Sequence, residues 1–273
     1  MPVDFDGTVV PVRTFGAGPP LLLVHGFPVS GFTWRFVLPG LAQRMTCHVV
    51  DLPGLGESRW TDRTDFSFPG QGTTLRRVAD ALGLGRYRVL AQDTGGTFAR
   101  HLALGDPRVE RLALINTEMP GHRPPWVPTY QRLMTMPGAA DALGALTRSR
   151  VFVRSPMGFG GFFCDPSLLD GEFAAEFVEP IRRSRTHRDG IRRYLRGAQW
   201  EPVDALRTRH AELTIPVRLV WGVEDPTFPV ALARTMVGQF PDADLVEIAG
   251  AKLLPHEERP VEVLDALAGF LAD

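Results

Sequence analysis

Short apolar stretches rich in leucine, valine and isoleucine alternate with helix-like stretches through most of this 273-residue chain, and glycine and proline often separate them. Alternation of this kind is typical of βα units, in which helices connect parallel strands and cover both faces of the sheet. The chain is therefore expected to fold as an α/β protein with a mostly parallel sheet. Strands are expected at Thr8–Phe15, Leu21–His25, Met45–Asp51, Tyr87–Ala91, Val109–Ile115, Val217–Trp221 and Leu245–Ile248.

The alternation stops between Met119 and Val203, where proline, glycine and short arginine-containing amphipathic segments replace it. This change predicts a helical insertion within the sheet domain. We expect a core made of residues 1–118 and 206–273, with a helical cap at 119–205. Core helices are expected from Thr73 or Thr74 to Leu82, and over Thr94–Leu104, Pro229–Phe240 and Val261–Leu271.

The charge balance argues against nucleic-acid and membrane partners. Thirty basic and 31 acidic side chains give a net charge of −1, so no broad cationic field would attract phosphates or anionic lipids. The N-terminus lacks the pattern of a secretory leader, and no apolar run reaches the roughly 18 residues that a membrane span needs. Cys47 and Cys164 are too few for a disulfide framework. We therefore expect a cytoplasmic monomer or homodimer that acts on a small molecule.

The residues Val89-Leu90-Ala91-Gln92-Asp93-Thr94-Gly95-Gly96-Thr97 carry a strand directly into a helix. A reactive side chain on so tight a turn needs small neighbours two residues before and after it, and Ala91 and Gly95 meet this requirement around Asp93. A helix N-terminus also favours an ionised carboxylate. The pattern predicts that Asp93 is a nucleophile presented on a strained turn.

At this point the chain resembles the α/β-hydrolase superfamily, and the Asp on the turn resembles its epoxide hydrolase and haloalkane dehalogenase branch. His25-Gly26-Phe27-Pro28 is similar to the oxyanion loop, Asp51-Leu52-Pro53-Gly54-Leu55-Gly56-Glu57-Ser58 to a turn of the family, and Trp221-Gly222-Val223-Glu224-Asp225 to the loop that carries the acid. The resemblance implies an eight-stranded sheet with a helical cap. It also implies Asp93 as nucleophile, Asp225 as triad acid, and the backbone N–H groups of Phe27 and Thr94 as the oxyanion hole.

One expected catalytic residue is missing. The family's basic histidine precedes the proline of the last helix by seven residues, and counting back from Pro260 places Leu253 there. Three substitutes remain open. His256 lies three residues further on; Glu118, with His122 nearby, follows a strand where some dehalogenases carry their acid; and Lys252, the only lysine beside 29 arginines, adjoins the vacant position. A lysine desolvated near Asp93 would pair with it or act as an acid or base.

The remaining residues bear on the substrate. Dehalogenases of this branch often place tryptophan after the nucleophile to hold the halide, whereas this chain has Thr94. Epoxide hydrolases use cap tyrosines to protonate the opening oxygen, and Tyr130 and Tyr194 are candidates for that role. The aromatic residues of the insertion predict an apolar pocket and include Trp126, Phe159, Phe162, Phe163 and Trp200.

The leading hypothesis is an epoxide hydrolase-like enzyme for a small to medium apolar substrate, with a haloalkane dehalogenase-like activity as a further alternative. A non-hydrolytic enzyme of the isomerase or lyase type, using Asp93 as base with Lys252, is also open, as is a ligand-binding protein without turnover. The sequence contains no metal-binding or nucleotide-binding motif, so no cofactor is expected.

Overall fold

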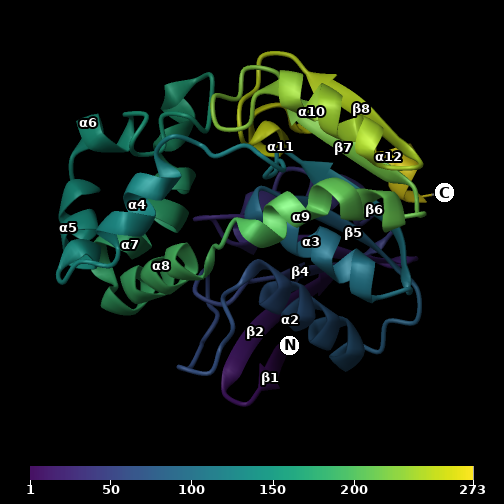
Figure 1. Cartoon of the computed structure of the whole chain (residues 1–273), viewed down its shortest axis with the longest axis horizontal. Coiled ribbons are helices and arrows are strands. Elements are labelled where there is room, and N and C mark those ends of the chain that lie inside the picture. The colour runs from purple at the N-terminus through teal and green to yellow at the C-terminus, as the bar shows by residue number, and fades with distance from the viewer. Residues whose placement is uncertain (273) are drawn as a thin grey trace.

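The computed structural model describes residues 1–272 and contains an eight-stranded sheet in the order β1-β2-β4-β3-β5-β6-β7-β8 (Figure 1). The pairs β1/β2 and β2/β4 are antiparallel, and every other neighbouring pair is parallel. The expected mostly parallel sheet is therefore confirmed. The strands are β1 Pro2–Phe5, β2 Thr8–Phe15, β3 Pro20–Val24, β4 Thr46–Val50, β5 Tyr87–Gln92, β6 Val109–Ile115, β7 Val217–Gly222 and β8 Ala243–Ile248.

Alternate residues of the central strands face opposite sides of the sheet, as the pleat requires. On β3, Leu22 and Val24 pack in one apolar cluster with residues of α2 (Phe68–Ala81) and α3 (Thr94–Gly105). Leu21 and Leu23 pack in a second cluster with Trp34 and with residues of α12 (Pro260–Ala272). Both faces of the sheet are thus covered by helices, which explains why these strands are apolar at nearly every position.

Two elements differ from the sequence expectation. The edge strand β1 was not expected, because four residues with a polar alternation give a weak strand pattern. The helix expected from Thr73 or Thr74 begins at Phe68, since the Ser67 hydroxyl caps it by accepting a hydrogen bond from Gly70 N at 3.1 Å. Gly70 and Gly72 have a low helix propensity, so the sequence did not indicate that the helix already begins at Phe68.

Six α-helices lie between β6 and β7, in the region where the strand alternation stops. They are α4 Val127–Leu133, α5 Ala139–Leu146, α6 Arg150–Val153, α7 Glu179–Arg183, α8 Arg185–Gly197 and α9 Glu201–Arg209. Helices α4–α8 gather at one end of the molecule in Figure 1, whereas α9 packs against α2 beside the sheet. Helix α9 also crosses the expected boundary at residue 205, and the division into domains stays a prediction.

The core also contains the short helices α1 Leu38–Leu41, α10 Val230–Met236 and α11 Pro255–Glu258 and the single turn η1 Gly31–Trp34. Further short turns of helix are η2 Pro166–Leu169, η3 Ala174–Val178 and η4 His210–Glu212 between β6 and β7, and η5 Val237–Gln239 directly after α10. Within residues 1–272, no helix combines the length and apolarity that crossing a lipid bilayer would require.

Candidate active site

The turn between β5 and α3 holds Asp93 in a strained backbone conformation. Asp93 has φ 52° and ψ −134°, a positive-φ geometry that side chains other than glycine rarely adopt. Two glycines make room for this turn. A Cβ on Gly26 would lie 2.3 Å from Asp93 Cβ, and a Cβ on Gly95 would lie 2.3 Å from the His25 carbonyl oxygen. The sequence therefore needs glycine at both positions for the carboxyl to be presented here.

Two backbone N–H groups converge on the Asp93 carboxyl. Phe27 N donates to Asp93 Oδ2 at 2.7 Å, and the backbone N–H of Thr94, the first residue of α3, lies near enough to lower the pKa of the same carboxyl. These are the two donors that the sequence resemblance proposed for an oxyanion hole. Donors fixed in this way stabilise negative charge on an oxygen attached to Asp93 Cγ, whether that oxygen belongs to a carboxylate or to a tetrahedral adduct.

A second buried carboxyl, that of Glu118, lies in the same site. Glu118 Oε2 accepts a hydrogen bond from the Thr97 hydroxyl at 2.7 Å. The Thr117 hydroxyl, which donates to the Asp93 carbonyl at 2.7 Å, lies 3.2 Å from the same Glu118 oxygen. Burial, together with the nearby Glu118 carboxyl, raises the pKa of Asp93 well above its ordinary value, and burial also raises the pKa of Glu118. Burial is the cause that the two shifts share, because a dry site disfavours the charged form of each carboxyl, and the Glu118 charge adds to this effect at Asp93.

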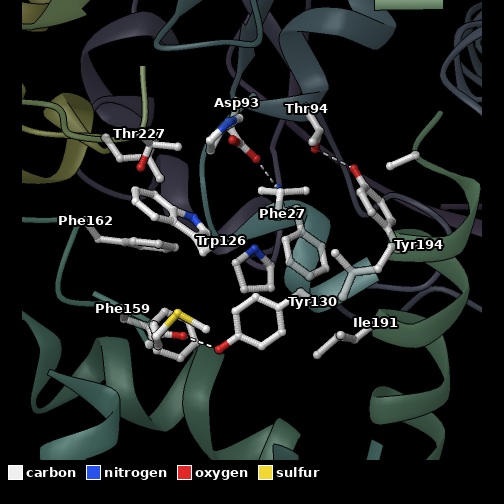
Figure 2. Close-up of a pocket in the computed structure, with 18 of the residues that line it drawn as sticks. Phe27, Asp93, Thr94, Trp126, Tyr130, Phe159, Phe162, Ile191, Tyr194 and Thr227 are labelled. Carbon is white, nitrogen blue, oxygen red and sulfur yellow. Dashed lines mark hydrogen bonds between the residues drawn. The ribbon is translucent and has the colours of Figure 1, made fainter. Parts of the chain in front are cut away.

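Asp93 and Glu118 open onto a cavity of about 140 Å³ between the sheet and the inserted helices (Figure 2). Its wall is mostly apolar and aromatic. No histidine, lysine or arginine contributes to it among the described residues, and Asp93 and Glu118 are its only carboxyls. The aromatic residues expected here include Trp126, Phe159, Phe162 and Trp200, whereas Phe163 packs in the core against Phe173.

The two candidate tyrosines line the cavity but their hydroxyls do not converge. The Tyr194 hydroxyl on α8 lies 2.6 Å from the Thr94 hydroxyl, next to Asp93. The Tyr130 hydroxyl on α4 donates instead to the Met157 carbonyl and points away from Asp93 in Figure 2. The expected pair of tyrosine acids is thus not assembled, because each hydroxyl is held by a partner on a different side of the cavity.

Asp225 lies in the loop after β7, held by hydrogen-bond donors and without a basic partner. Asn116 Nδ2 donates to its Oδ2 at 2.7 Å, and Thr227 N donates to its Oδ1 at 2.7 Å. Burial raises the pKa of Asp225 to about 7. Leu253, at the position where the sequence resemblance implies a histidine, is buried and lines the cavity with Asp93.

The structure does not bring His256 to the cavity. Its Nε2 lies 2.8 Å from the Thr33 hydroxyl, which itself donates to Glu257, and its ring packs on Trp34 with centroids 4.7 Å apart. Burial lowers the pKa of His256 to about 3, so the imidazole is neutral at physiological pH. Its buried contacts lie on the face of the sheet covered by α12, and His256 does not line the cavity that holds Asp93.

Replacing His256 with phenylalanine is expected to reduce the acid sensitivity of the fold. Because the folded pKa lies below the ordinary value of 6.5, the unfolded chain binds this proton first, and stability is lost as pH falls below 6.5. For one such histidine the loss between pH 7.5 and pH 5 is about 2 kcal/mol. Thermal unfolding at both pH values should show a smaller drop for His256→Phe than for the unchanged chain. Equal drops would contradict this account.

The side chains of Lys252 and His122 also lie beside backbone carbonyl groups and not beside the Asp93 carboxyl. Lys252 Nζ lies 3.4 Å from the Gly160 carbonyl, and its backbone N–H donates to Glu258. Lys252 does not line the cavity, whereas its neighbour Leu253 does. His122 Nε2 lies 2.8 Å from the Thr227 carbonyl. Among the hydrogen bonds and ion pairs of the described residues, none joins His122 to Glu118, so the proposed Glu118–His122 pair is not assembled.

Sequence reasoning missed the polar groups beneath Asp93. Arg100 on α3 is fully buried, and its guanidinium donates to the hydroxyls of Thr97 and Thr117. Asn116, at the end of β6, bridges Asp225 and Gly222 N. The pattern of apolar residues along a helix does not indicate that an arginine is buried, because an arginine is read as a solvent-facing residue. Only tertiary packing shows that Arg100 is buried. Within residues 1–272, no group of three or more metal-ligating side chains is arranged to hold an ion.

The chain is similar in sequence to a known family and to proteins that have names. Residues 19–260 match the family described as alpha/beta hydrolase fold. A soluble epoxide hydrolase from Corynebacterium sp. (strain C12) is 29% identical over 269 residues, which cover 95% of this chain and 92% of the relative. Haloalkane dehalogenase 2 from Mycobacterium tuberculosis is 27% identical over 257 residues, covering 92% of this chain and 87% of the relative.

Two further comparisons extend this range. The magnesium-chelatase 30 kDa subunit of Rhodobacter capsulatus is 31% identical over 262 residues, which cover 94% of this chain and 86% of the relative. The crystal structure of an alpha/beta hydrolase fold protein from Burkholderia ambifaria is 25% identical, with a TM-score of 0.85, and covers 98% of this chain and 97% of that one. The names of the relatives thus include two hydrolytic activities and one protein named for a chelatase.

Proposed function

The chain belongs to the alpha/beta hydrolase fold family, and from that premise we propose that it is an epoxide hydrolase-like enzyme with Asp93 as nucleophile. The observation that carries the proposal is the Asp93 carboxyl, held by Phe27 N–H at 2.7 Å and by Thr94 N–H at the wall of an apolar cavity. The relative from Corynebacterium, which is named as a soluble epoxide hydrolase, supports the same reaction class.

The first step is attack by an Asp93 oxygen on an epoxide carbon. A new C–O bond joins the substrate to Asp93, the ring C–O bond breaks, and the leaving oxygen takes up a proton. Tyr194 is the donor that the geometry favours, because its hydroxyl lies beside Thr94 and burial raises its pKa, which keeps it protonated. The product is an ester of Asp93 with a hydroxyl on the neighbouring substrate carbon.

The second step is attack by water on Asp93 Cγ, which releases a diol and restores the carboxylate. The N–H groups of Phe27 and Thr94 stabilise the negative oxygen that forms on Cγ. Glu118 takes one proton from water and passes it to the departing diol oxygen, since among the described residues it is the only other carboxyl that lines the cavity. The second water proton leaves Asp93 as its carboxylate forms again, and it restores the Tyr194 hydroxyl that gave up its proton in the first step. Among the described residues, the hydrogen-bond partners of the Asp225 carboxyl are Asn116 and Thr227 rather than a histidine, so Asp225 is given no part in this step.

The cavity favours a small to medium apolar substrate. Its volume of about 140 Å³ corresponds to about five water molecules at the density of the liquid, and polar groups of its wall include Asp93, Thr94 and Tyr194. A monosubstituted epoxide with an aromatic or short aliphatic group fits this distribution, because its oxygen reaches the polar end while its substituent contacts the aromatic wall. Styrene oxide and 1,2-epoxyhexane are suitable probes.

Isotope labelling in ¹⁸O-water is expected to place the first label in the protein. If water attacks Asp93 Cγ, one turnover gives a diol without ¹⁸O and an Asp93 carboxylate that carries it. Mass spectrometry of the peptide containing Asp93 after single turnover would show a gain of about 2 Da, and the diol would become labelled only in later turnovers. Intact-protein mass during the reaction would show the ester itself, with a long lifetime if Glu118 is a weak base.

Two controls make the labelling result specific. Incubation without epoxide in the same water measures background exchange, and 1-bromobutane in place of epoxide tests whether a halide also leaves. Label in the first diol and none in Asp93 would mean direct attack by water and would overturn the nucleophile assignment.

The second candidate is a non-hydrolytic reaction with Asp93 as general base. The raised pKa of Asp93, caused by burial and by Glu118, is the observation that favours it, because a base works best with a pKa near the operating pH. The relative named as a magnesium-chelatase subunit shows that this fold is not restricted to proteins named as hydrolases. Turnover without any ¹⁸O in Asp93 and without adduct would support this candidate.

A further inference from the structure

Arg100 is fully buried, and within residues 1–272 its guanidinium forms no ion pair with a carboxylate. Its Nε donates to the Gly96 carbonyl at 3.2 Å, one terminal nitrogen to His210 Nε2 at 3.3 Å, and the other to the Glu118 carbonyl at 2.7 Å. The same second nitrogen donates to Thr97 and Thr117 at 2.8 and 3.2 Å. A buried charge needs a counter-charge to be tolerated, so the acid that balances Arg100 must be found beyond these first contacts.

The directions of the hydrogen bonds identify that acid. Arginine has only donors, so the Thr97 and Thr117 hydroxyls must accept from Arg100 and pass their own protons onward. Thr97 Oγ1 donates to Glu118 Oε2 at 2.7 Å, and Thr117 Oγ1 donates to the Asp93 carbonyl at 2.7 Å. Glu118 Oε2 therefore accepts from hydrogen-bond donors, an arrangement that favours the ionised carboxylate over the neutral acid.

We propose that Arg100 is a positioning residue that favours the ionised form of Glu118 through the Thr97 hydroxyl, so that Glu118 can accept the proton of the attacking water. This role rests on the proposed function for the second step. The first step prepares it, because esterification of Asp93 removes the negative charge that opposes ionisation of Glu118. Ester formation therefore lowers the pKa of Glu118 at the stage when its carboxylate form is needed.

Other charged and titratable groups around this network are consistent with the assignment. Asp93 approaches Glu118 from the turn after β5, and Tyr194 approaches from α8 as a neutral hydroxyl. His210 faces Arg100 as a neutral acceptor, because its Nδ1 pairs with Gln239 and burial lowers its pKa to about 3. His101 on α3 is likewise neutral, since burial lowers its pKa to about 4. Arg100 is therefore the cation of this buried site.

The test is a ¹³C NMR titration of Glu118 in protein labelled at the glutamate carboxyl carbons, with the Glu118 signal assigned by its loss in Glu118→Gln. Thr97→Val removes the hydroxyl that links Arg100 to Glu118, and we expect it to raise the Glu118 midpoint by about one pH unit or more. Thr97→Ser keeps the hydroxyl and should restore the original midpoint. Asp93→Asn removes the opposing charge and should lower the midpoint.

Thr235→Val is the matched control, because Thr235 lies on α10 and its hydroxyl donates only to the Ala231 carbonyl. Its Glu118 midpoint should equal that of the unchanged protein. Thr97→Ala provides the same comparison should the valine variant fail to fold. An unchanged midpoint in the Thr97 variants would overturn the role of Arg100, and an unchanged midpoint in Asp93→Asn would overturn the coupling between the two steps.

The titration needs no substrate, so its result is separate from the labelling experiment. A shifted midpoint without any Asp93 adduct would leave the Arg100 network intact and reject the covalent function. An Asp93 adduct whose hydrolysis has the same pH profile in Thr97→Val and in unchanged protein would do the reverse.

Discussion

Asp93→Asn is expected to abolish both the covalent adduct and the diol, with a loss of rate of at least about 10³-fold. An amide oxygen is a much poorer nucleophile than a carboxylate, and the substitution leaves the cavity shape almost unchanged. Thermal stability should stay equal or rise at neutral pH, because burial and the Glu118 carboxyl disfavour the ionised form of Asp93 in the fold. The measurement is diol formation and intact mass with styrene oxide, together with the melting temperature.

Asp242→Asn is the matched control for this experiment, because Asp242 is an exposed carboxylate in the turn before β8. It makes the same chemical change at a distance from the cavity wall and should leave activity unaltered. Full activity in Asp93→Asn would remove the chemical role of this residue in every enzymatic hypothesis considered above, and would leave a ligand-binding role for the cavity.

Leu253→His is expected to accelerate hydrolysis of the Asp93 ester by about 10²-fold or more. Leu253 is buried and lines the cavity with Asp93, and the loop carrying Asp225 contributes Thr227 and Phe228 to the same wall. An imidazole at this position would gain an acid partner whose carboxylate is already fixed by Asn116. Stopped reactions followed by intact mass would show a shorter lifetime of the ester and a faster release of diol.

Lys252→His serves as the control, because it places an imidazole one residue away on a side chain that does not line the cavity. It should leave the lifetime of the ester unchanged. If a folded Leu253→His protein shows no acceleration, Asp225 and Asp93 are not placed to use a base at position 253. The interpretation that Leu253 occupies the position of the family's histidine would then fail.

The strands and core helices could be predicted because their signals are local. Seven of the expected strands coincide with β2–β8 to within two residues at either end, and Thr94–Leu104 matches α3 within one residue. Apolar periodicity and the flanking glycines and prolines act over a few neighbouring residues, so they can be read without knowledge of the fold. The errors fall where such signals are weak, at the short edge strand β1 and at the glycine-containing start of α2.

The turn at Asp93 is the part of the site that the local sequence determined. Its small neighbours, its helix N-terminus and the Gly26 loop were all visible as motifs, and the structure brings Phe27 N–H to the carboxyl. Leu253 was visible in the same way, as a departure at a fixed distance from Pro260.

Only the tertiary structure decided which of the remaining polar residues share the site. Lys252 and Leu253 are adjacent in sequence, yet only Leu253 lines the cavity, while His256 is buried against Trp34. Glu118 reaches Asp93 because β5 and β6 pair in parallel and their carboxyl ends meet at one edge of the sheet. Such proximity, like the burial of Arg100 and the pKa shifts that follow from it, depends on packing between distant segments, which no local pattern encodes.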